Sequence, residues 1–245
     1  MLAAVFRFHG ELNDFLAHAR RQAHISIRFN SDQSVKHLIE ALGVPHTQVG
    51  RVLASGQQVD FSYLVQDGDR VEVYPLSIED RSVKQLGEPR FVVDNHLGRL
   101  AVYLRMLGFD TLYRNDYDDD ELAQTAGLDE RILLTRDQRL LMRNQVRRGY
   151  WVRSKIPHEQ IVEVLRRYGL SAQVIPFKRC MRCNGLLQPV DKEAVLHRLE
   201  PLTKKYFDQF RICSECSQLY WQGSHYERMA NFIDQVVEES KGAAS

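Results

Sequence analysis

Four cysteines stand in two C-x-x-C pairs, Cys180/Cys183 and Cys213/Cys216, with 29 residues between the pairs. Each pair places two thiolates on one side of a tight turn, and together they offer four soft ligands that suit tetrahedral Zn²⁺. A closed shell of four cysteines leaves no open position for catalysis, so the spacing predicts a structural metal. A redox disulfide would need a thioredoxin-like βαβ pattern beside one pair, and that pattern is missing. Four reduced cysteines favour a cytoplasmic protein.

A second set of candidate residues is acidic. Asp94 follows the apolar run 91–93, Asp137 follows the run 131–135, and Asp119 lies where a loop enters a helix. The carboxyl ends of parallel strands share one edge of a sheet, so we expect the three side chains to converge there. They would repel one another without cations, which predicts a Mg²⁺ or Mn²⁺ site able to support phosphodiester hydrolysis. Helix capping is the alternative, because Asp119 and Asp137 each precede a predicted helix.

The elements that must position these aspartates alternate along the chain from Arg90 to Gly169. Short apolar runs predict buried parallel strands, and apolar residues at helical spacing predict the helices between them. This alternation predicts an α/β fold, a parallel sheet flanked by helices. Strands are expected at 91–93, 110–113, 131–135 and 150–153, and helices at 97–107, 122–126, 140–146 and 157–168.

The N-terminal region follows another pattern. Alternating side chains predict strands at 3–8, 24–29, 51–53, 58–60 and 71–74, and a helix with Val35, Leu38, Ile39 and Leu42 on one face, capped by Ser31 or Asp32. This ββαββ order resembles the ubiquitin-like β-grasp, especially its sulfur-carrier branch. That branch acts through a free C-terminal Gly-Gly, whereas here the chain continues after Pro75. We therefore expect a docking module for a protein partner, followed by a polar linker.

Charge is unevenly distributed behind the net value of +1. Residues 88–137 carry 6 basic and 11 acidic side chains, whereas residues 138–211 carry 16 basic and 6 acidic ones. A nuclease needs carboxylates to hold cations and basic residues to hold a polyanion, which this distribution would supply. The alternative is a chance distribution of solvated charges. Tyr150, Trp151 and Tyr206 are interleaved and can stack bases if exposed, but burial is expected for Trp151. The residues expected to bind RNA are Arg147, Arg148, Lys204 and Lys205.

The segments FVVD, HLGRLAVYLRMLGFDT, DDDELAQTA and RILLTRDQRLL resemble PIN-like nucleases. More specifically, they are similar to the Mut-seven C-terminal RNase domain family, which ends in a zinc ribbon and often carries a ubiquitin-like unit in bacteria. The resemblance covers roughly 90–229. It implies that Asp94, Asp119 and Asp137 bind the catalytic metal, with Asp118 or Asp120 as the alternative to Asp119.

One departure from the PIN pattern concerns the carboxylates. A full PIN domain carries a further glutamate on an intervening helix pair, but only 24 residues lie between Asp94 and Asp119. Either the family works with fewer carboxylates or its activity is weak. Arg99 is expected near the scissile phosphate or, alternatively, in a surface salt bridge with the acidic loop, whose carboxylates lie in residues 116–121. His96 is expected to cap or pack rather than act as a general base.

Together these patterns predict a metal-dependent ribonuclease with a catalytic Mg²⁺ or Mn²⁺ and a structural Zn²⁺. The alternatives are a non-catalytic RNA- or ribosome-binding adaptor with a zinc ribbon and, less well supported, a sulfur-transfer or ubiquitin-like adaptor. RNA is the expected partner, with the ribosome or tRNA as candidates, and no apolar run is long enough for a membrane span. The predicted domains are β-grasp 1–76, linker 77–89, PIN-like nuclease 90–175, and zinc ribbon with C-terminal helix 176–245.

Overall fold

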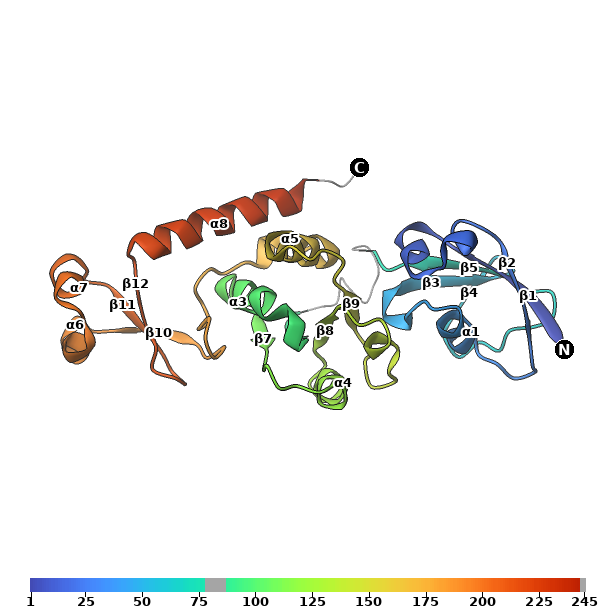
Figure 1. Cartoon of the computed structure of the whole chain (residues 1–245), viewed down its shortest axis with the longest axis horizontal. Helices are drawn as coiled ribbons and strands as arrows, with labels where there is room; N and C mark the ends of the chain where they lie inside the picture. The colour runs from blue at the N-terminus through green and yellow to red at the C-terminus, as the bar shows by residue number, and fades with distance from the viewer. Residues whose placement is uncertain (78–86, 243–245) are drawn as a thin grey trace. The chain divides into compact units, whose positions relative to one another are not determined.

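The computed structural model describes residues 1–77 and 87–242 (Figure 1). Most of the predicted linker, residues 78–86, lies outside the described residues. The chain divides into two units, each built from separated segments. The first unit comprises Met1–Leu86 and Asp119–Trp151, and the second comprises Gly87–Asp118 and Val152–Ser245.

A five-stranded sheet forms the N-terminal part of the first unit, and its strand order is β2-β1-β5-β3-β4. The central strands β1 and β5 pair in parallel, while the other neighbours pair antiparallel. This mixed sheet, with one helix after its first hairpin, is the predicted β-grasp arrangement. Its strands are β1 (Leu2–Phe8), β2 (Ile25–Phe29), β3 (Val49–Ala54), β4 (Gln57–Val59) and β5 (Arg70–Pro75).

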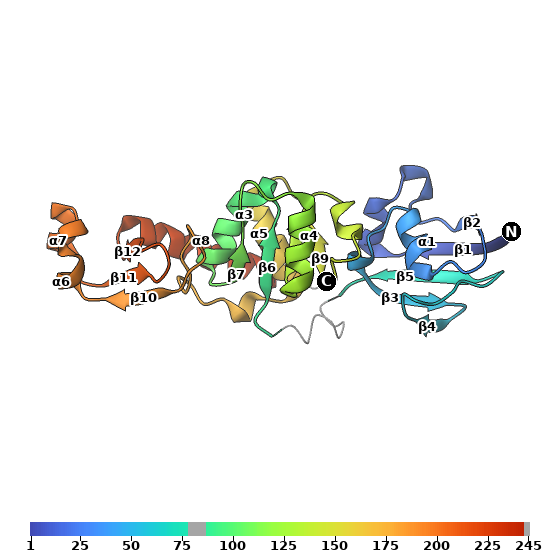
Figure 2. The same ribbon diagram turned by 90° about the horizontal axis from the view of Figure 1, so that it is seen from below.

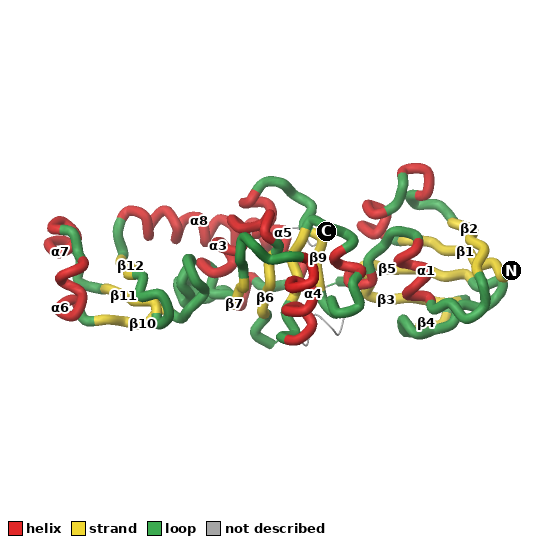
Figure 3. The backbone as a smooth tube through the Cα atoms, turned by 60° about the horizontal axis from the view of Figure 1, so that its bottom comes forward, coloured by secondary structure: helices red, strands yellow, loops and turns green. Residues whose placement is uncertain are grey.

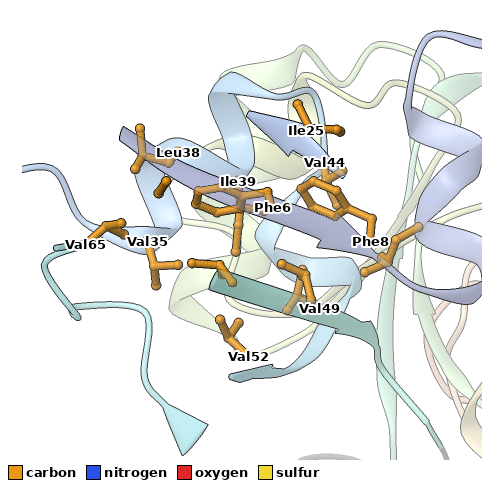
Figure 4. Close-up of a cluster of buried hydrophobic side chains, with 14 of the residues drawn as sticks. Phe6, Phe8, Ile25, Val35, Leu38, Ile39, Val44, Val49, Val52 and Val65 are labelled. Atoms are coloured by element: carbon orange, nitrogen blue, oxygen red, sulfur yellow. The ribbon is translucent and has the colours of Figure 1, made fainter. Parts of the chain in front are cut away.

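The helix α1 (Val35–Ala41) packs its apolar stripe against this sheet (Figures 2 and 4). Val35 and Ile39 are fully buried and lie in one core with Phe6. The helix is capped by Ser34, whose Oγ accepts a hydrogen bond from His37 N at 3.3 Å, so the predicted cap at Ser31 or Asp32 was wrong. Asp32 has a φ of +66°, whereas an N-cap residue needs an extended backbone such as that of Ser34.

The alternating region forms a parallel sheet with the order β7-β6-β8-β9. In the second unit β6 (Arg90–Val93) pairs in parallel with β7 (Asp110–Leu112), and α3 (Gly98–Met106) packs against both. In the first unit β8 (Ile132–Thr135) pairs in parallel with β9 (Gly149–Trp151), and α4 (Asp119–Leu128) packs against β8. The apolar runs of β6 and β8 are buried, as expected for parallel strands covered by helices.

The helix predicted at 140–146 is reduced to a single 3-10 turn, Leu140–Met142. Side chains before it hold the backbone in local turns: Thr135 Oγ1 accepts from Asp137 N at 2.9 Å, and Asp137 Oδ1 accepts from Arg139 N at 2.7 Å. Such bonds compete with helix formation. Val146 is buried as expected, but it lies in a segment outside any helix or strand.

The first unit also holds contacts between the β-grasp fold and the strand β9. His46 Nε2 donates to the Val146 carbonyl at 2.9 Å, and Gln48 Nε2 donates to the Gly149 carbonyl at 3.0 Å. The ring of Trp151 lies 4.9 Å from that of Phe15, centroid to centroid, and is partly buried against the β-grasp core. The β-grasp fold therefore covers β9, an edge strand of the parallel sheet.

In the second unit, α5 (Pro157–Tyr168) lies beside α8 (Ser224–Lys241), as Figure 1 shows. Pro157 begins α5, and Gly169, with a φ of +63°, ends it in the left-handed conformation, as predicted. Arg166 Nε donates to the Glu239 carbonyl at 3.1 Å and joins the two helices. In the described part of the chain, no helix combines the length and apolar character needed to cross a bilayer.

The C-terminal part of the second unit is a three-stranded antiparallel sheet, drawn in yellow beside two short helices in Figure 3. The helices are inserted between its first two strands, and Val195, Leu199, Phe210 and Leu219 form a small core. The elements are β10 (Leu187–Val190), α6 (Lys192–Val195), α7 (Pro201–Tyr206), β11 (Phe210–Cys213) and β12 (Leu219–Trp221).

Candidate functional site

The two cysteine pairs meet at one point of the second unit, where all four Sγ atoms lie within 4.8 Å of one another. Cys180 Sγ is 3.6 Å from Cys216 Sγ, and Cys183 Sγ is 3.3 Å from Cys213 Sγ. These separations exceed a disulfide bond of about 2.05 Å. They are slightly shorter than the sulfur–sulfur distance of about 3.8 Å that follows from tetrahedral geometry and a Zn–S bond of about 2.3 Å. The donor set therefore fits zinc.

The local environment gives two of the cysteine thiols different pKa values in the metal-free protein. Burial acts to raise the pKa of Cys180, but the Tyr220 hydroxyl, 3.2 Å from its Sγ, and the backbone N–H groups of Cys183 and Arg182 outweigh burial and lower that pKa to about 7. Burial raises the pKa of Cys183 to about 12. Hydrogen-bond donors thus surround the Cys180 sulfur, as a thiolate ligand requires.

The turn that carries the first cysteine pair is attached to the parallel sheet. Arg105, only 4% exposed on α3, donates from Nε to the Thr111 carbonyl at 2.9 Å and from Nη1 to the Arg182 carbonyl at 3.0 Å. Asn184 Oδ1 accepts from Thr111 N at 2.9 Å, and its Nδ2 donates to Asp110 Oδ1 at 2.9 Å. The edge strand β7 and the cysteine turn therefore satisfy each other's polar groups.

These supporting residues were missed from the sequence, although two signals point to them. Arg105 stands four residues after Ala101, a position on the apolar face of α3, and a basic residue on a buried face needs partners. Asn184 directly follows Cys183 and precedes Gly185, and Asn-Gly is a strong turn signal. The Asn184 φ of +77° agrees with such a turn.

Asp94 lies in the second unit, directly after β6, and is 6% exposed. It stands before the 3-10 turn Asn95–Leu97, where its Oδ1 accepts from His96 N at 3.4 Å. The side chain of His96 is exposed, so the expected packing role was wrong. Arg99 is exposed on the first turn of α3, and its guanidinium lies 5.9 Å from the centre of the Tyr103 ring.

Asp119 and Asp137 lie in the first unit, and both are exposed. Asp119 and Asp120 begin α4, where the helix dipole favours negative charge. Arg143 is the cation beside them: its Nη2 lies 3.8 Å from Asp119 Oδ2, and its Nη1 contacts Asp120. In the part of the chain that the structure describes, Arg143 thus pairs with Asp119 and Asp120, the role that was the alternative for Arg99.

The three predicted metal-binding aspartates are divided between the units, because Asp94 belongs to the second and the other two to the first. Among the described residues, the four cysteines are the group of Asp, Glu, His and Cys side chains that comes within reach of one metal ion. The residues proposed to bind RNA are all exposed. Arg147 and Arg148 precede β9 in the first unit, and Lys204 and Lys205 lie in α7 of the second.

The chain thus combines a β-grasp fold, a parallel α/β sheet and a four-cysteine ribbon. Family models match it in that order: the Mut7-C ubiquitin model covers residues 1–80 and the Mut7-C RNAse domain model covers residues 89–233. The chain belongs to the Mut7-C RNase domain family, which confirms the resemblance inferred from its sequence. No curated protein matches it. Among solved structures, small archaeal modifier protein 1 of H. volcanii is 14% identical, with a TM-score of 0.25, covering 31% of this chain and 98% of its own.

Proposed function

We propose that this protein is a metal-dependent ribonuclease that hydrolyses phosphodiester bonds of RNA. The observation that carries the proposal is the match of residues 89–233 to an RNase domain family. Asp94 directly after β6 and Asp137 two residues after β8 are consistent with it, because ligands of parallel sheets gather at the carboxyl ends of strands.

The proposed roles follow from side-chain chemistry. Asp94, Asp119 and Asp137 would hold Mg²⁺ or Mn²⁺, with Asp120 as the neighbouring alternative, because hard cations prefer carboxylate oxygens. Such a cation, when bound, activates water and stabilises charge on the phosphate. Arg99 is exposed, so its planar guanidinium is accessible to phosphate oxygens.

The cysteines, the exposed basic residues and the β-grasp domain would support this activity. Cys180, Cys183, Cys213 and Cys216 would hold a structural Zn²⁺, and Arg147, Arg148, Lys204 and Lys205 would bind the RNA backbone. The β-grasp domain, 1–76, would dock a protein partner, with the nuclease domain at 90–175 and the ribbon at 176–245. RNA in the cytoplasm is the proposed substrate, with the ribosome or tRNA as the candidate partners.

Removal of one carboxylate charge tests the catalytic assignment. We expect Asp94→Asn and Asp137→Asn each to abolish cleavage of labelled single-stranded and structured RNA in Mn²⁺ or Mg²⁺, because either change weakens cation binding. Asp234→Asn is the matched control, since Asp234 is an exposed aspartate on α8 of the ribbon region. It should cleave at the parent rate.

Thermal unfolding separates catalysis from folding in these variants. Full activity of both Asp94→Asn and Asp137→Asn would contradict the assignment, whereas unfolding would support the capping role. Absence of cleavage in the parent protein, with RNA binding retained, would instead support the non-catalytic RNA- or ribosome-binding adaptor.

A further inference from the structure

The zinc-ribbon region contains a cavity of about 140 Å³ between its strands and the start of α8. Its walls include Phe177, Trp221 and Tyr226, and its lining contains no acidic residue. The ring centroids of Phe177 and Tyr226 are 4.6 Å apart and the planes differ by 30°, so these two rings form one stacked wall. Trp221 is 39% exposed, which leaves part of its indole open to a ligand.

The size of this cavity limits its occupant. An engineered cavity of about 150 Å³ in another protein holds one benzene molecule. A cavity of 140 Å³ that opens to solvent therefore accepts a single flat ring system rather than a folded peptide segment. Gly223 contributes to the access, because a Cβ at this position would lie 3.1 Å from Trp221 Nε1. The glycine leaves the indole edge uncovered.

Polar groups at the cavity indicate which flat ring it takes. Gln209 and Gln222 lie in its lining and are exposed, so their amides can donate to and accept from a ring edge. Arg211 adds a fixed positive charge, because its Nη1 donates to the Phe177 carbonyl at 3.0 Å. A cationic ligand is therefore disfavoured, and a base carried on a negatively charged backbone is favoured.

Two lysines that could hold that backbone lie near the cavity residue Gln209 in the sequence. Lys204 and Lys205 precede Gln209 by five and four residues, and both are exposed in α7. Between them and Gln209, Phe207 reaches the same region, since its Cζ would lie 3.7 Å from a Cβ at Gly223. These lysines are the candidates to pair with phosphates flanking a base in the cavity.

We propose that this cavity binds one unstacked nucleobase of single-stranded RNA. The proposal rests on the proposed function in naming RNA as the polymer. Aromatic walls accept any base by stacking, while the glutamine amides contact its edge. Tyr220 lines the cavity and also donates to Cys180 Sγ at 3.2 Å, so the cysteine cluster supports the cavity directly.

Trp221 fluorescence tests the proposal without altering the cavity. Trp151 is the second tryptophan of the chain, and Trp151→Phe leaves Trp221 as the single indole. We expect a short single-stranded RNA to quench Trp221 emission in this zinc-loaded protein, with no Mg²⁺ or Mn²⁺ added so that the RNA stays intact. An abasic oligonucleotide of equal length carries the same phosphates and should bind without quenching.

A cavity variant gives the second readout. Trp221→Leu should weaken binding of the base-bearing RNA by roughly five- to 150-fold, the usual effect of removing one stacking ring, and leave the abasic affinity unchanged. The matched control is Leu202→Ala, because Leu202 is a 69% exposed apolar side chain in the same region that does not line the cavity. It should change the ratio of the two affinities less than twofold.

Equal quenching by the base-bearing and abasic strands would overturn the proposal and leave the cavity to an apolar side chain of a protein partner. Base-dependent quenching in a protein that cleaves no RNA would support the cavity and refute the ribonuclease assignment. Cleavage without base-dependent quenching would support the ribonuclease assignment and refute base binding in the cavity. The two proposals therefore fail separately.

Discussion

Arg105 is a buried cation that donates hydrogen bonds to the main-chain carbonyls of Thr111, Met181 and Arg182. Burial lowers its pKa, while the neighbouring thiols of Cys183 and Cys180 act to raise it. The planar guanidinium reaches Thr111 on β7 and the cysteine turn at the same time, which a lysine ammonium on a flexible stem would not reproduce. A zinc ion held by four thiolates would give the cluster a net charge of −2, and a positive charge at this point would stabilise it.

Replacing Arg105 tests that role. We expect Arg105→Met to lower the free energy of unfolding by roughly 2–4 kcal/mol, because buried carbonyls lose charged hydrogen-bond donors. Zinc should also be released faster to a colorimetric chelator. Arg99→Met on the same helix, at an exposed position, should change stability by less than about 0.5 kcal/mol. Equal zinc release from both variants would show that Arg105 does not support the cysteine turn.

At the scale of elements, the sequence predicted the helices and strands whose hydrophobic period is clear. Val35 and Ile39 mark α1, and the apolar runs of β6 and β8 mark parallel strands, because burial selects those residues directly. The prediction of a helix at 140–146 was wrong because the side chains of Thr135 and Asp137 accept local hydrogen bonds from the backbone. The spacing of apolar residues does not reveal such bonds. At the site, cysteine spacing predicted the cluster, but Arg105 and Asn184 depend on tertiary contacts.

The 3-10 turn His46–Gln48 is the element through which the β-grasp fold contacts β9. Gln48 is 1% exposed, and its Nε2 is the donor to the Gly149 carbonyl. Gln48→Leu should cost about 1–3 kcal/mol, because it leaves a buried carbonyl without that donor. Hydrogen exchange of β9 amides should accelerate.

Gln57→Leu is the control for this change, because Gln57 is an exposed glutamine of the same sheet. It should leave β9 exchange unchanged and alter stability by less than about 0.5 kcal/mol. Unchanged β9 exchange in Gln48→Leu as well would mean that the turn contributes nothing to holding the strand.

For the whole molecule, the charge distribution predicts how RNA affinity depends on four basic residues and on salt. Replacing Arg147, Arg148, Lys204 and Lys205 with alanine should weaken RNA binding and reduce the log–log salt slope by about 0.7 for each lost phosphate contact. Filter binding across a salt series measures both quantities. The matched control removes four exposed arginines from the β-grasp fold: Arg7, Arg20, Arg28 and Arg70.

Both quadruple variants lose the same net charge, so they separate local contacts from overall attraction. We expect the control to bind RNA within about twofold of the parent at physiological salt, where exposed charges are screened over roughly 8 Å. If both variants lose affinity and slope equally, only net charge matters and these four positions are not the RNA contact.

Both edge strands of the parallel sheet are covered by other parts of the chain, which limits the fragments of the protein that can stay soluble. Within its own unit β7 is covered by Asn184 from the cysteine turn, and β9 by Gln48 from the β-grasp fold. Uncovered edges with free N–H and C=O groups recruit strands from other molecules. A fragment limited to residues 90–175 would lose both covers and become prone to aggregate, so the cysteine turn and the β-grasp fold each keep the strand edge that they cover soluble.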